Sequence, residues 1–411
     1  MTARMSLPIV DVDVAEEGVT GVPAAEGGVA LLLRHRGYPV GFVMYETGPS
    51  GRQSSVEMRA LLDAPTATRI LSRTASDELP QLPASRERPA VSVAICTRDR
   101  PEYLERCLES LQRLVPAAAL ETAAFEIIVV DNAPADERTR EVAGRFAGLR
   151  YLREPTPGLN FARNTALEQA AGEVVAYLDD DVVVDRGWLA GLVAAWQAQP
   201  QAGFFTGQVL PLELATAAQV VFERRGGFRR GFEREYFGAL RDNDRYYPCG
   251  AGVFGTGANM AVNRHALLAI GGFDTALDTG RPLPGGGDLD VFYRLIRAGH
   301  GAVYEPGYLV FHQHRRQMAE LRRQYRDSWG KSFVAFAVKS WRTDPPMRAR
   351  WRALLVWWFG KQITDLFQAV AGRVSRPPSL ILAELAGGIV GLTGEYGRSC
   401  RRAQRLAGGT E

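Results

Sequence analysis

The chain has 411 residues, of which 46% are hydrophobic and 23% charged, values typical of a globular protein with a sizeable core. No stretch reaches the roughly 18–20 uninterrupted apolar residues that span a bilayer, and the four cysteines lack metal-ligand spacing and disulfide-framework density. These features argue against a membrane-spanning protein and a disulfide-stapled secreted domain, and they favour a reducing, cytoplasmic setting.

Charge is unevenly distributed along the chain. The net charge is only +3, yet residues 315–411 carry 18 Lys or Arg against 7 Asp or Glu. A basic C-terminal region behind a mildly acidic body predicts contact with an anionic surface. We therefore expect a cytoplasmic protein that can lie peripherally on the cytoplasmic face of a membrane.

The N-terminal region, residues 1–85, is predicted to be a small β-rich accessory unit. Two apolar runs, 29–33 and 40–45, flank a turn with Gly and Pro, which is typical of a hairpin. Residues 77–89 are rich in proline and charge and are predicted to be a linker. We find no chemistry-bearing motif in this region.

The central region, residues 90–314, alternates strand and helix patterns. Apolar, β-branched runs predict buried strands, and Pro101 can open the helix that follows the first of them. This rhythm predicts a parallel sheet with helices on both faces. The strands are expected at 91–96, 126–131 and 174–178, and two further helices at 160–171 and 188–199.

The C-terminal region, residues 315–411, is predicted to be helical, basic and rich in tryptophan. The apolar run 353–359 follows three arginines, a mixture that suits an amphipathic helix on anionic lipid. A helical subdomain that packs on the catalytic core explains the same pattern. Both interpretations stay open, because different faces of the helices could serve each.

Polar residues follow three of the predicted strands: Thr97 to Arg100, Asp131-Asn132, and Asp179 to Asp181. Ligands of open parallel sheets bind at the carboxyl ends of the strands. If these strands are neighbours, the three ends converge on one crevice.

The run Asp179-Asp180-Asp181 predicts a metal site. Adjacent carboxylates repel one another, and a hard divalent ion such as Mg²⁺ or Mn²⁺ relieves that repulsion with oxygen ligands. Asp179 and Asp181 point to the same side of extended backbone. The ion would bridge a diphosphate and offset the charge that develops as it leaves. The alternative is a solvated acidic turn that caps the next helix.

Six segments, in this order and spacing, resemble glycosyltransferase family 2. They are CTRDRP (96–101), IIVVDN (127–132), GLNFARNTAL (158–167), AYLDDDVVVDRGWL (176–189), GTGANMAVNRHALLAIGGFD (255–274) and GGGDLDVFYRLIRAGH (285–300). The resemblance implies an inverting enzyme with the GT-A fold, a Rossmann-like mixed sheet flanked by helices. It also implies a nucleotide-sugar donor and a bound Mn²⁺ or Mg²⁺ ion.

The resemblance assigns the donor and metal residues. Asp131 matches the acid that hydrogen-bonds the nucleobase or ribose, and Arg163 and Asn164 match residues beside the nucleotide. Thr97 and Arg98 are expected on the donor as well. The Asp179 to Asp181 run matches the DXD motif, in which Asp179 and Asp180 face the diphosphate and Asp179 and Asp181 hold the metal. A late histidine, His312 or His314, completes the set, and we take His312 as the metal ligand.

The resemblance also assigns Asp288 as the catalytic base, which takes the proton of the acceptor hydroxyl as the sugar is transferred with inversion. Asp after glycines also suits a helix N-cap, a role compatible with catalysis. The family usually reads Glu-Asp where this chain has Gly287-Asp288, so the carboxylate expected beside the base is missing. Asp290, two positions further along the helix, would face elsewhere.

Two further segments are expected near the acceptor. Gly255, Gly257 and Ala258 let backbone approach a ligand closely and are predicted to line the sugar or acceptor pocket. Residues 222–247, rich in arginine and aromatics, are predicted to be a mobile loop over the acceptor site.

The favoured donor is a UDP-sugar, with dTDP- and GDP-sugars open. The acceptor is expected to be a cell-envelope or lipid-linked glycan in polysaccharide biosynthesis. Two alternatives are a natural-product glycosyltransferase with a small-molecule acceptor and an inactive nucleotide-sugar-binding module. A nucleotidyltransferase is disfavoured, because no glycine-rich loop follows the first strand of residues 90–314. No nucleic-acid reader pattern is present.

Overall fold

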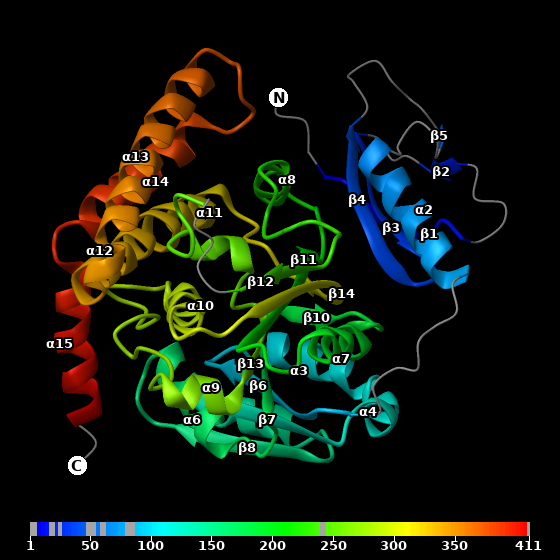
Figure 1. Ribbon diagram of the computed structural model, residues 1–411, viewed down its shortest axis with the longest axis horizontal. Coiled ribbons are helices and arrows are strands. Elements are labelled where there is room, and N and C mark those ends of the chain that lie inside the picture. The colour runs from blue at the N-terminus through cyan, green and yellow to red at the C-terminus, as the bar shows by residue number, and fades with distance from the viewer. Residues whose placement is uncertain are drawn as a thin grey trace.

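The computed structural model describes residues 6–15, 21–23, 27–46, 55–57, 63–78, 87–238 and 244–408. A large α/β body carries a small N-terminal lobe on one side and a group of C-terminal helices on the other (Figure 1). The candidate site belongs to the α/β body.

The α/β body is built on a mixed sheet with the order β10-β14-β11-β13-β9-β6-β7-β8, with β12 paired to β14. Strands β9, β6, β7 and β8 are parallel, as the strand–helix rhythm predicts, whereas β13 runs antiparallel to β9 and β11. The sheet as a whole is therefore mixed, as the resemblance implies. Its strands are β6 (Ala90–Thr97), β7 (Ala124–Asn132), β8 (Leu149–Glu154), β9 (Val174–Asp179), β10 (Val182–Val184), β11 (Phe204–Pro211), β12 (Glu235–Phe237), β13 (Asn259–Asn263) and β14 (Ala302–His312).

Helices cover both faces of the sheet, so the central strands are apolar on both sides. In β6, Val93 and Ile95 pack with Leu104 of α3 (Pro101–Gln112), on the face that α7 (Trp188–Ala198) also covers. Ala94 faces the other way, toward Leu167 of α6 (Leu159–Gln169) and the side of α10 (Gly287–Arg297). Shorter helices α4 (Val115–Glu121), α5 (Arg138–Ala143), α8 (Ala217–Arg224) and α9 (Arg264–Ala269) and the 3-10 turn η1 (Ala251–Phe254) complete the body.

The N-terminal lobe contains the predicted hairpin and a helix that the sequence did not predict. Its sheet has the order β1-β3-β4, and α2 covers one face (Figure 1). Arg36 and Gly37 form the hairpin turn with φ of 49° and 81°, the geometry of a tight two-residue connection. The predicted linker lies largely outside the described residues, since 79–86 are not described. The elements are β1 (Ile9–Asp13), β2 (Gly21–Pro23), β3 (Gly28–His35), β4 (Tyr38–Glu46), β5 (Ser55–Glu57) and α2 (Ala64–Glu78).

The lobe is fastened to the α/β body by buried polar contacts. Arg34, which is 2% exposed, donates to Asp185 at 2.6 Å, and the Tyr38 hydroxyl donates to Glu305 at 2.6 Å. Apolar side chains of β3 and β4 share a core cluster with β11 and β14. Removing one partner of a buried ion pair costs about 3–5 kcal/mol, so loss of either Arg34 or Asp185 should destabilise the protein.

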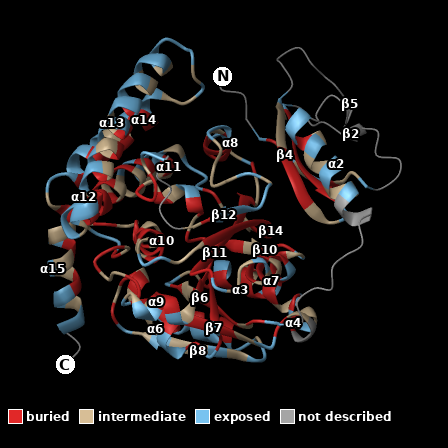
Figure 2. Cartoon of the chain, viewed as in Figure 1, coloured by how far each residue is buried: buried red, intermediate tan, exposed pale blue. Residues whose placement is uncertain are grey.

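The C-terminal region is helical, as predicted, and part of it packs on the α/β body. Apolar side chains of α12 and the first half of α13 join the core cluster of α10. The remainder of α13 extends with α14 as a hairpin whose outer surface is exposed (Figure 2). Among the described residues no helix is long and apolar enough to cross a membrane. The helices are α11 (Met318–Gln324), the π-helical η2 (Tyr325–Ser332), α12 (Phe333–Thr343), the 3-10 turn η3 (Pro345–Met347), α13 (Arg348–Val370), α14 (Pro378–Gly391) and α15 (Glu395–Gly408).

Candidate active site

The three polar strand ends converge, because β6 lies between β9 and β7. Thr97 Oγ1 donates to Asp180 Oδ2 at 2.7 Å. Arg100 bridges the aspartates, with Nη1 2.7 Å from Asp180 Oδ1 and Nη2 2.7 Å from Asp181 Oδ2. The contact from Arg100 was missed by sequence reasoning, which chose Arg98. The Arg98 side chain is 53% exposed and pairs with Asp99 at 3.6 Å.

The three aspartates sit in very different electrostatic environments. Burial raises the pKa of Asp180 to about 7, although Arg100 opposes that shift. Burial and the neighbouring Asp181 carboxylate raise the pKa of Asp179. Burial also opposes ionisation of Asp181, but His312 and Arg100 outweigh it and hold the pKa of Asp181 well below its usual range. Asp181 is therefore the carboxylate held most firmly as an anion.

Asp179, Asp181 and His312 form a cluster that can hold a metal ion. One ligand atom from each lies within 4.8 Å of the others. His312 Nε2 is 3.3 Å from Asp181 Oδ1, and that buried oxygen has no hydrogen-bond partner. A buried carboxylate oxygen without a partner is costly unless a cation contacts it.

Hydrogen bonds from His312 to His314, and from His314 to Glu223, orient the His312 ring, so that its Nε2 faces the proposed cation site. His314 Nε2 lies 2.8 Å from Glu223 Oε1, and His314 Nδ1 lies 3.0 Å from His312 Nδ1. Because the carboxylate accepts, His314 Nε2 carries the hydrogen. Burial lowers the pKa of His314, so its Nδ1 is an acceptor for the N–H of His312 Nδ1. In the neutral ring of His312 the hydrogen then lies on Nδ1, so Nε2, which faces Asp181 Oδ1, can bind a cation.

This arrangement fits a divalent ion and selects between the two histidines. Two lone pairs facing each other need a shared cation, either a proton or a metal, and Asp181 accordingly raises the pKa of His312 against the effect of burial. Both ring nitrogens of His314 are occupied, so His312 is the available ligand. Two carboxylates and an imidazole suit Mn²⁺, and the oxygens alone would suit Mg²⁺.

Asp131 lies at the end of β7 and offers a free acceptor. It is fully buried, and Tyr151 donates to its Oδ2 at 2.8 Å. Its Oδ1 has no partner, and burial raises the pKa of the carboxyl. Asp99 Oδ1 accepts from Ala135 N at 2.8 Å and so ties the loop after β6 to the loop after β7. These loops frame a place where a ligand N–H or O–H can bond to Asp131.

Arg163 and Asn164 are adjacent on α6 but have different surroundings. The Asn164 amide is occupied by backbone, because it donates to Phe273 O at 2.9 Å and accepts from Phe273 N at 2.8 Å. Arg163 is buried, with Nη2 3.8 Å from Asp179 and Nη1 3.3 Å from Asp278. Arg163 therefore links the metal-site aspartates to a second carboxylate.

Asp288 is held at the start of α10 by a contact with Gly257. The helix begins at Gly287 after Gly286, so the N-cap role expected for Asp288 is wrong. Asp288 Oδ2 accepts from Gly257 N at 2.8 Å. A Cβ at residue 257 would lie 3.0 Å from Arg163 Nη2 and 3.1 Å from Asp288 Cβ. Gly257 therefore lies close to both Asp288 and Arg163, and a larger side chain there would push against them.

Asp278 is a carboxylate in this site that sequence reasoning missed. It is buried, accepts from Gly287 N at 3.0 Å and pairs with Arg163. Burial raises its pKa to about 6, and nearby Asp288 adds to the shift while Arg163 opposes it. The backbone of Asp278 has φ of 55°, and its position ten residues before Asp288 belongs to no motif that we identified.

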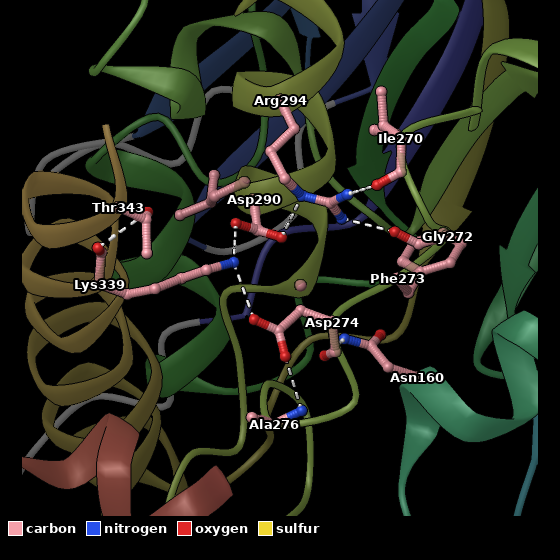
Figure 3. Close-up of polar contacts among 12 residues, drawn as sticks. Asn160, Ile270, Gly272, Phe273, Asp274, Ala276, Asp290, Arg294, Lys339 and Thr343 are labelled. Atoms are coloured by element: carbon pink, nitrogen blue, oxygen red, sulfur yellow. Dashed lines mark hydrogen bonds and ion pairs between the residues drawn. The ribbon is translucent and has the colours of Figure 1, made fainter. Parts of the chain in front are cut away.

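Asp290 has other partners than Asp288, as expected, and its carboxylate contacts Arg294 and Lys339 (Figure 3). It accepts from Arg294 Nε at 2.7 Å and forms an ion pair with Lys339 of α12. Lys339 also lies 2.8 Å from Asp274, and Arg294 donates to Gly272 O at 2.6 Å. The network fixes the start of α10 against the turn that leads to Asp278.

The predicted mobile loop over 222–247 is partly regular structure. Strand β12 pairs with β14, and Arg230 Nε donates to Gly252 O at 2.7 Å. Residues 239–243 lie outside the described part of the chain.

Comparisons with known proteins agree with this architecture. The profile of "Glycosyl transferase family 2" matches residues 92–236, and that of "Glycosyl transferase family group 2" matches residues 174–390. The second match covers more than half of the chain. The chain belongs to glycosyltransferase family 2, and its mixed sheet with flanking helices is the GT-A fold.

Curated relatives are similar over part of the chain. The chain is 26% identical to the pre-mycofactocin glycosyltransferase of Mycobacterium tuberculosis over 336 residues, which are 81% of this chain and 63% of that protein. It therefore spans less than two thirds of that relative. It is 26% identical over 192 residues to the glucosyl-dolichyl phosphate glucuronosyltransferase of Haloferax volcanii, 46% of this chain and 57% of the relative. Superposition on a mannosyltransferase of Pyrobaculum calidifontis, solved with GDP-Man and Mn²⁺, gives a TM-score of 0.47 at 19% identity, covering 82% of this chain and 91% of the other.

Proposed function

We propose that the chain is a metal-dependent inverting glycosyltransferase that moves a sugar from a nucleotide-diphosphate-sugar to a hydroxyl acceptor. One observation carries the proposal. The buried Asp181 Oδ1 lacks a hydrogen-bond partner and faces His312 Nε2 at 3.3 Å, at the strand end that also bears Asp179. Membership of glycosyltransferase family 2 supports a sugar donor at this cation site.

One set of residues is proposed to stabilise the leaving diphosphate, and another to activate the acceptor hydroxyl. Asp179, Asp181 and His312 would hold Mn²⁺ or Mg²⁺, which when bound offsets the negative charge of the departing diphosphate. Asp288, oriented by Gly257, takes the proton of the acceptor hydroxyl as the new bond forms. Arg163 links the metal-binding residues to the residues near the base through its contacts with Asp179 and Asp278.

The donor is proposed to be a UDP-sugar, with dTDP- and GDP-sugars as the alternatives. The free Oδ1 of Asp131 supports a nucleoside contact, because it can accept from a base N–H or a ribose hydroxyl. Thr97, Arg98 and Asp180 are proposed on the diphosphate side. Asn164 is proposed to support the nucleotide site through Phe273 rather than by direct contact.

The acceptor is proposed to be a lipid-linked or cell-envelope glycan used at the cytoplasmic face of a membrane. Exposed apolar side chains on α13 and α14 support this location; they include Val356, Phe367, Val370 and Ile389. A relative named for glucosyl-dolichyl phosphate is consistent with a lipid-linked acceptor, and one named for pre-mycofactocin with a small molecule.

The test is a screen of UDP-, dTDP- and GDP-sugars for hydrolysis with Mn²⁺ and with EDTA. We expect sugars of one nucleotide class to be hydrolysed when Mn²⁺ is present and not when EDTA is present. Once an acceptor is supplied, the product should have inverted anomeric configuration. Turnover of sugar-1-phosphate with a nucleoside triphosphate would instead identify a nucleotidyltransferase. Hydrolysis that persists in both Asp181→Ala and Asp288→Asn would not come from this site, and it would favour an inactive binding module.

A further inference from the structure

A large basic cavity lies beside the site and is used by none of the steps above. Its volume is about 1340 Å³, and it is walled by residues 280–284, Arg315, α11, η2 and α15. Nine Arg or Lys side chains line it, against two acidic ones, Glu320 and Asp327. Typical small-molecule sites measure about 300–1,000 Å³, so this cavity has room for a phosphate group together with the body of a larger molecule.

The cations that line the cavity are largely uncompensated within the described part of the chain. Asp327 pairs with Arg326 and Lys331, and Glu395 lies beside Arg398. Six arginines form no ion pair with any described residue: Arg281, Arg315, Arg323, Arg401, Arg402 and Arg405. The Nε of Arg402 is buried without a hydrogen-bond partner.

The arginines of α15 are arranged in a way that disfavours the isolated helix. Arg398, Arg401, Arg402 and Arg405 recur at spacings of three and four, so they share one helix face. Like charges at such spacings repel one another. That face meets further cations of α11 and η2 across the cavity. An anion bound between them would remove the repulsion and supply the missing partners.

The cavity wall is continuous along the chain with two segments of the proposed site. Residues 280–284 form one wall, and the chain continues from them through Gly287 to Asp288. Arg315 forms another part of the wall, three positions beyond His312. A molecule anchored in the cavity therefore lies next to the segment that carries the base and the segment that carries the metal ligand.

We propose that this cavity binds the phosphate or diphosphate group of the acceptor, so that the molecule receiving the sugar is phosphorylated. The proposal rests on the transferase function above and narrows its acceptor class. Arginine suits this role because its planar, always-charged guanidinium bonds phosphate oxygens in pairs.

The test is calorimetric titration of the full chain with inorganic pyrophosphate in EDTA. Without a metal ion the donor site lacks its cation, so binding reports the cavity. We expect saturable binding that weakens with salt. In the triple variant Arg323→Gln/Arg401→Gln/Arg405→Gln it should weaken about tenfold or more, because three charge-assisted contacts are lost. All three side chains are exposed, so the variant should fold.

A matched control removes the same charge elsewhere. Arg113→Gln/Arg342→Gln/Arg373→Gln changes three exposed arginines outside the cavity and should bind pyrophosphate like the wild type. Equal weakening in both triple variants, or no binding by the wild type, would overturn the proposal.

A second probe, geranyl diphosphate, identifies the source of the phosphate. Tighter binding than pyrophosphate indicates a lipid-linked acceptor, and equal binding indicates a soluble phosphorylated one; either result supports the cavity as the site. If neither probe binds while anionic vesicles bind less well to the cavity variant than to the control, the cations serve a membrane surface and the proposal is wrong.

Wild-type donor hydrolysis with Mn²⁺ is measured separately. Its absence contradicts the transferase function, and its presence without pyrophosphate binding contradicts only the cavity as a phosphate site.

Discussion

Asp278 accepts a hydrogen bond from the backbone N–H of Gly287 at 3.0 Å, and its carboxylate fills the space that a side chain at residue 287 would need. A Cβ built at Gly287 would lie 2.2 Å from Asp278 Oδ2 and 2.4 Å from Asn160 Nδ2. The glutamate usual at this position in the family is therefore incompatible with the observed placement of Asp278. A carboxylate is still present beside Asp288, supplied by another segment.

Substitution of Gly287 should consequently be destabilising. We expect Gly287→Ala to cost about 1–3 kcal/mol, because Asp278 and Asn160 must move to admit the methyl group. Gly287→Glu should be worse alone and improved by Asp278→Gly, which vacates the space. Chemical denaturation measures each change. A Gly287→Ala variant as stable as the wild type would show that the carboxylate does not occupy this position.

The stability contribution of Asp278 should depend on pH. Burial raises its folded-state pKa to about 6, above the ordinary 3.8, so between these values the folded protein binds more protons than the unfolded chain. Wild-type stability should therefore fall as pH rises through this window. Asp278→Asn removes this pH dependence. Relative to the wild type, the free energy of unfolding of the variant should therefore rise by at most about 3 kcal/mol between pH 4 and pH 7. Urea denaturation at both pH values measures the shift; the same difference at both is the contrary result.

Asp288 and Asp290 should behave in opposite ways although they lie on the same helix. Asp288→Asn should lower the turnover of sugar transfer about 10²–10⁴-fold with little change in melting temperature, because it removes the base. Asp290→Asn should mainly lower the melting temperature, because it leaves Lys339 and Arg294 without their shared anion. Steady-state kinetics and thermal melts on both variants decide the matter. Loss of stability in Asp288→Asn with normal turnover would reverse the assignment.

The sequence predicted the strand ends well because each follows a long buried run. Asp131 and the Asp179 to Asp181 run lie where the pattern placed them, at the ends of β7 and β9 on either side of β6. Arg98 was chosen over Arg100 because nothing in the local pattern says which side chain turns back toward the aspartates. The chain has already left the strand there, and Asp99 has φ of 52°.

Other contacts were beyond sequence reasoning because they join distant segments. Asp278 reaches Gly287 from a loop with left-handed backbone, and Arg34 pairs with Asp185 across 151 positions. Glu223 orders His312 through His314, although 91 positions separate Glu223 from His314. Such pairs form only when the tertiary fold brings their segments together.

The outer face of α13 should contribute to membrane binding. Val356, Ile363, Phe367 and Val370 lie on one side of the helix, and they are 70%, 47%, 72% and 74% exposed. Ile363→Glu/Phe367→Glu should reduce sedimentation with phosphatidylglycerol vesicles about tenfold or more, because two large apolar side chains are lost from the interface. Leu71→Glu, a similar change at a 69% exposed position on α2, is the control. Equal sedimentation of the two variants would remove α13 from the interface.

The metal site is the central claim, and Mn²⁺ binding followed by electron paramagnetic resonance tests it most directly. The wild type should bind one Mn²⁺ ion, and Asp181→Asn should abolish the binding because it removes the carboxylate oxygen that lacks a partner. Glu223→Gln should weaken it about 10–100-fold, since that change frees the orientation and tautomer of His312. Asp136→Asn, at an exposed aspartate outside the site, should bind normally. Equal Mn²⁺ affinity in the wild type and Asp181→Asn would contradict the account.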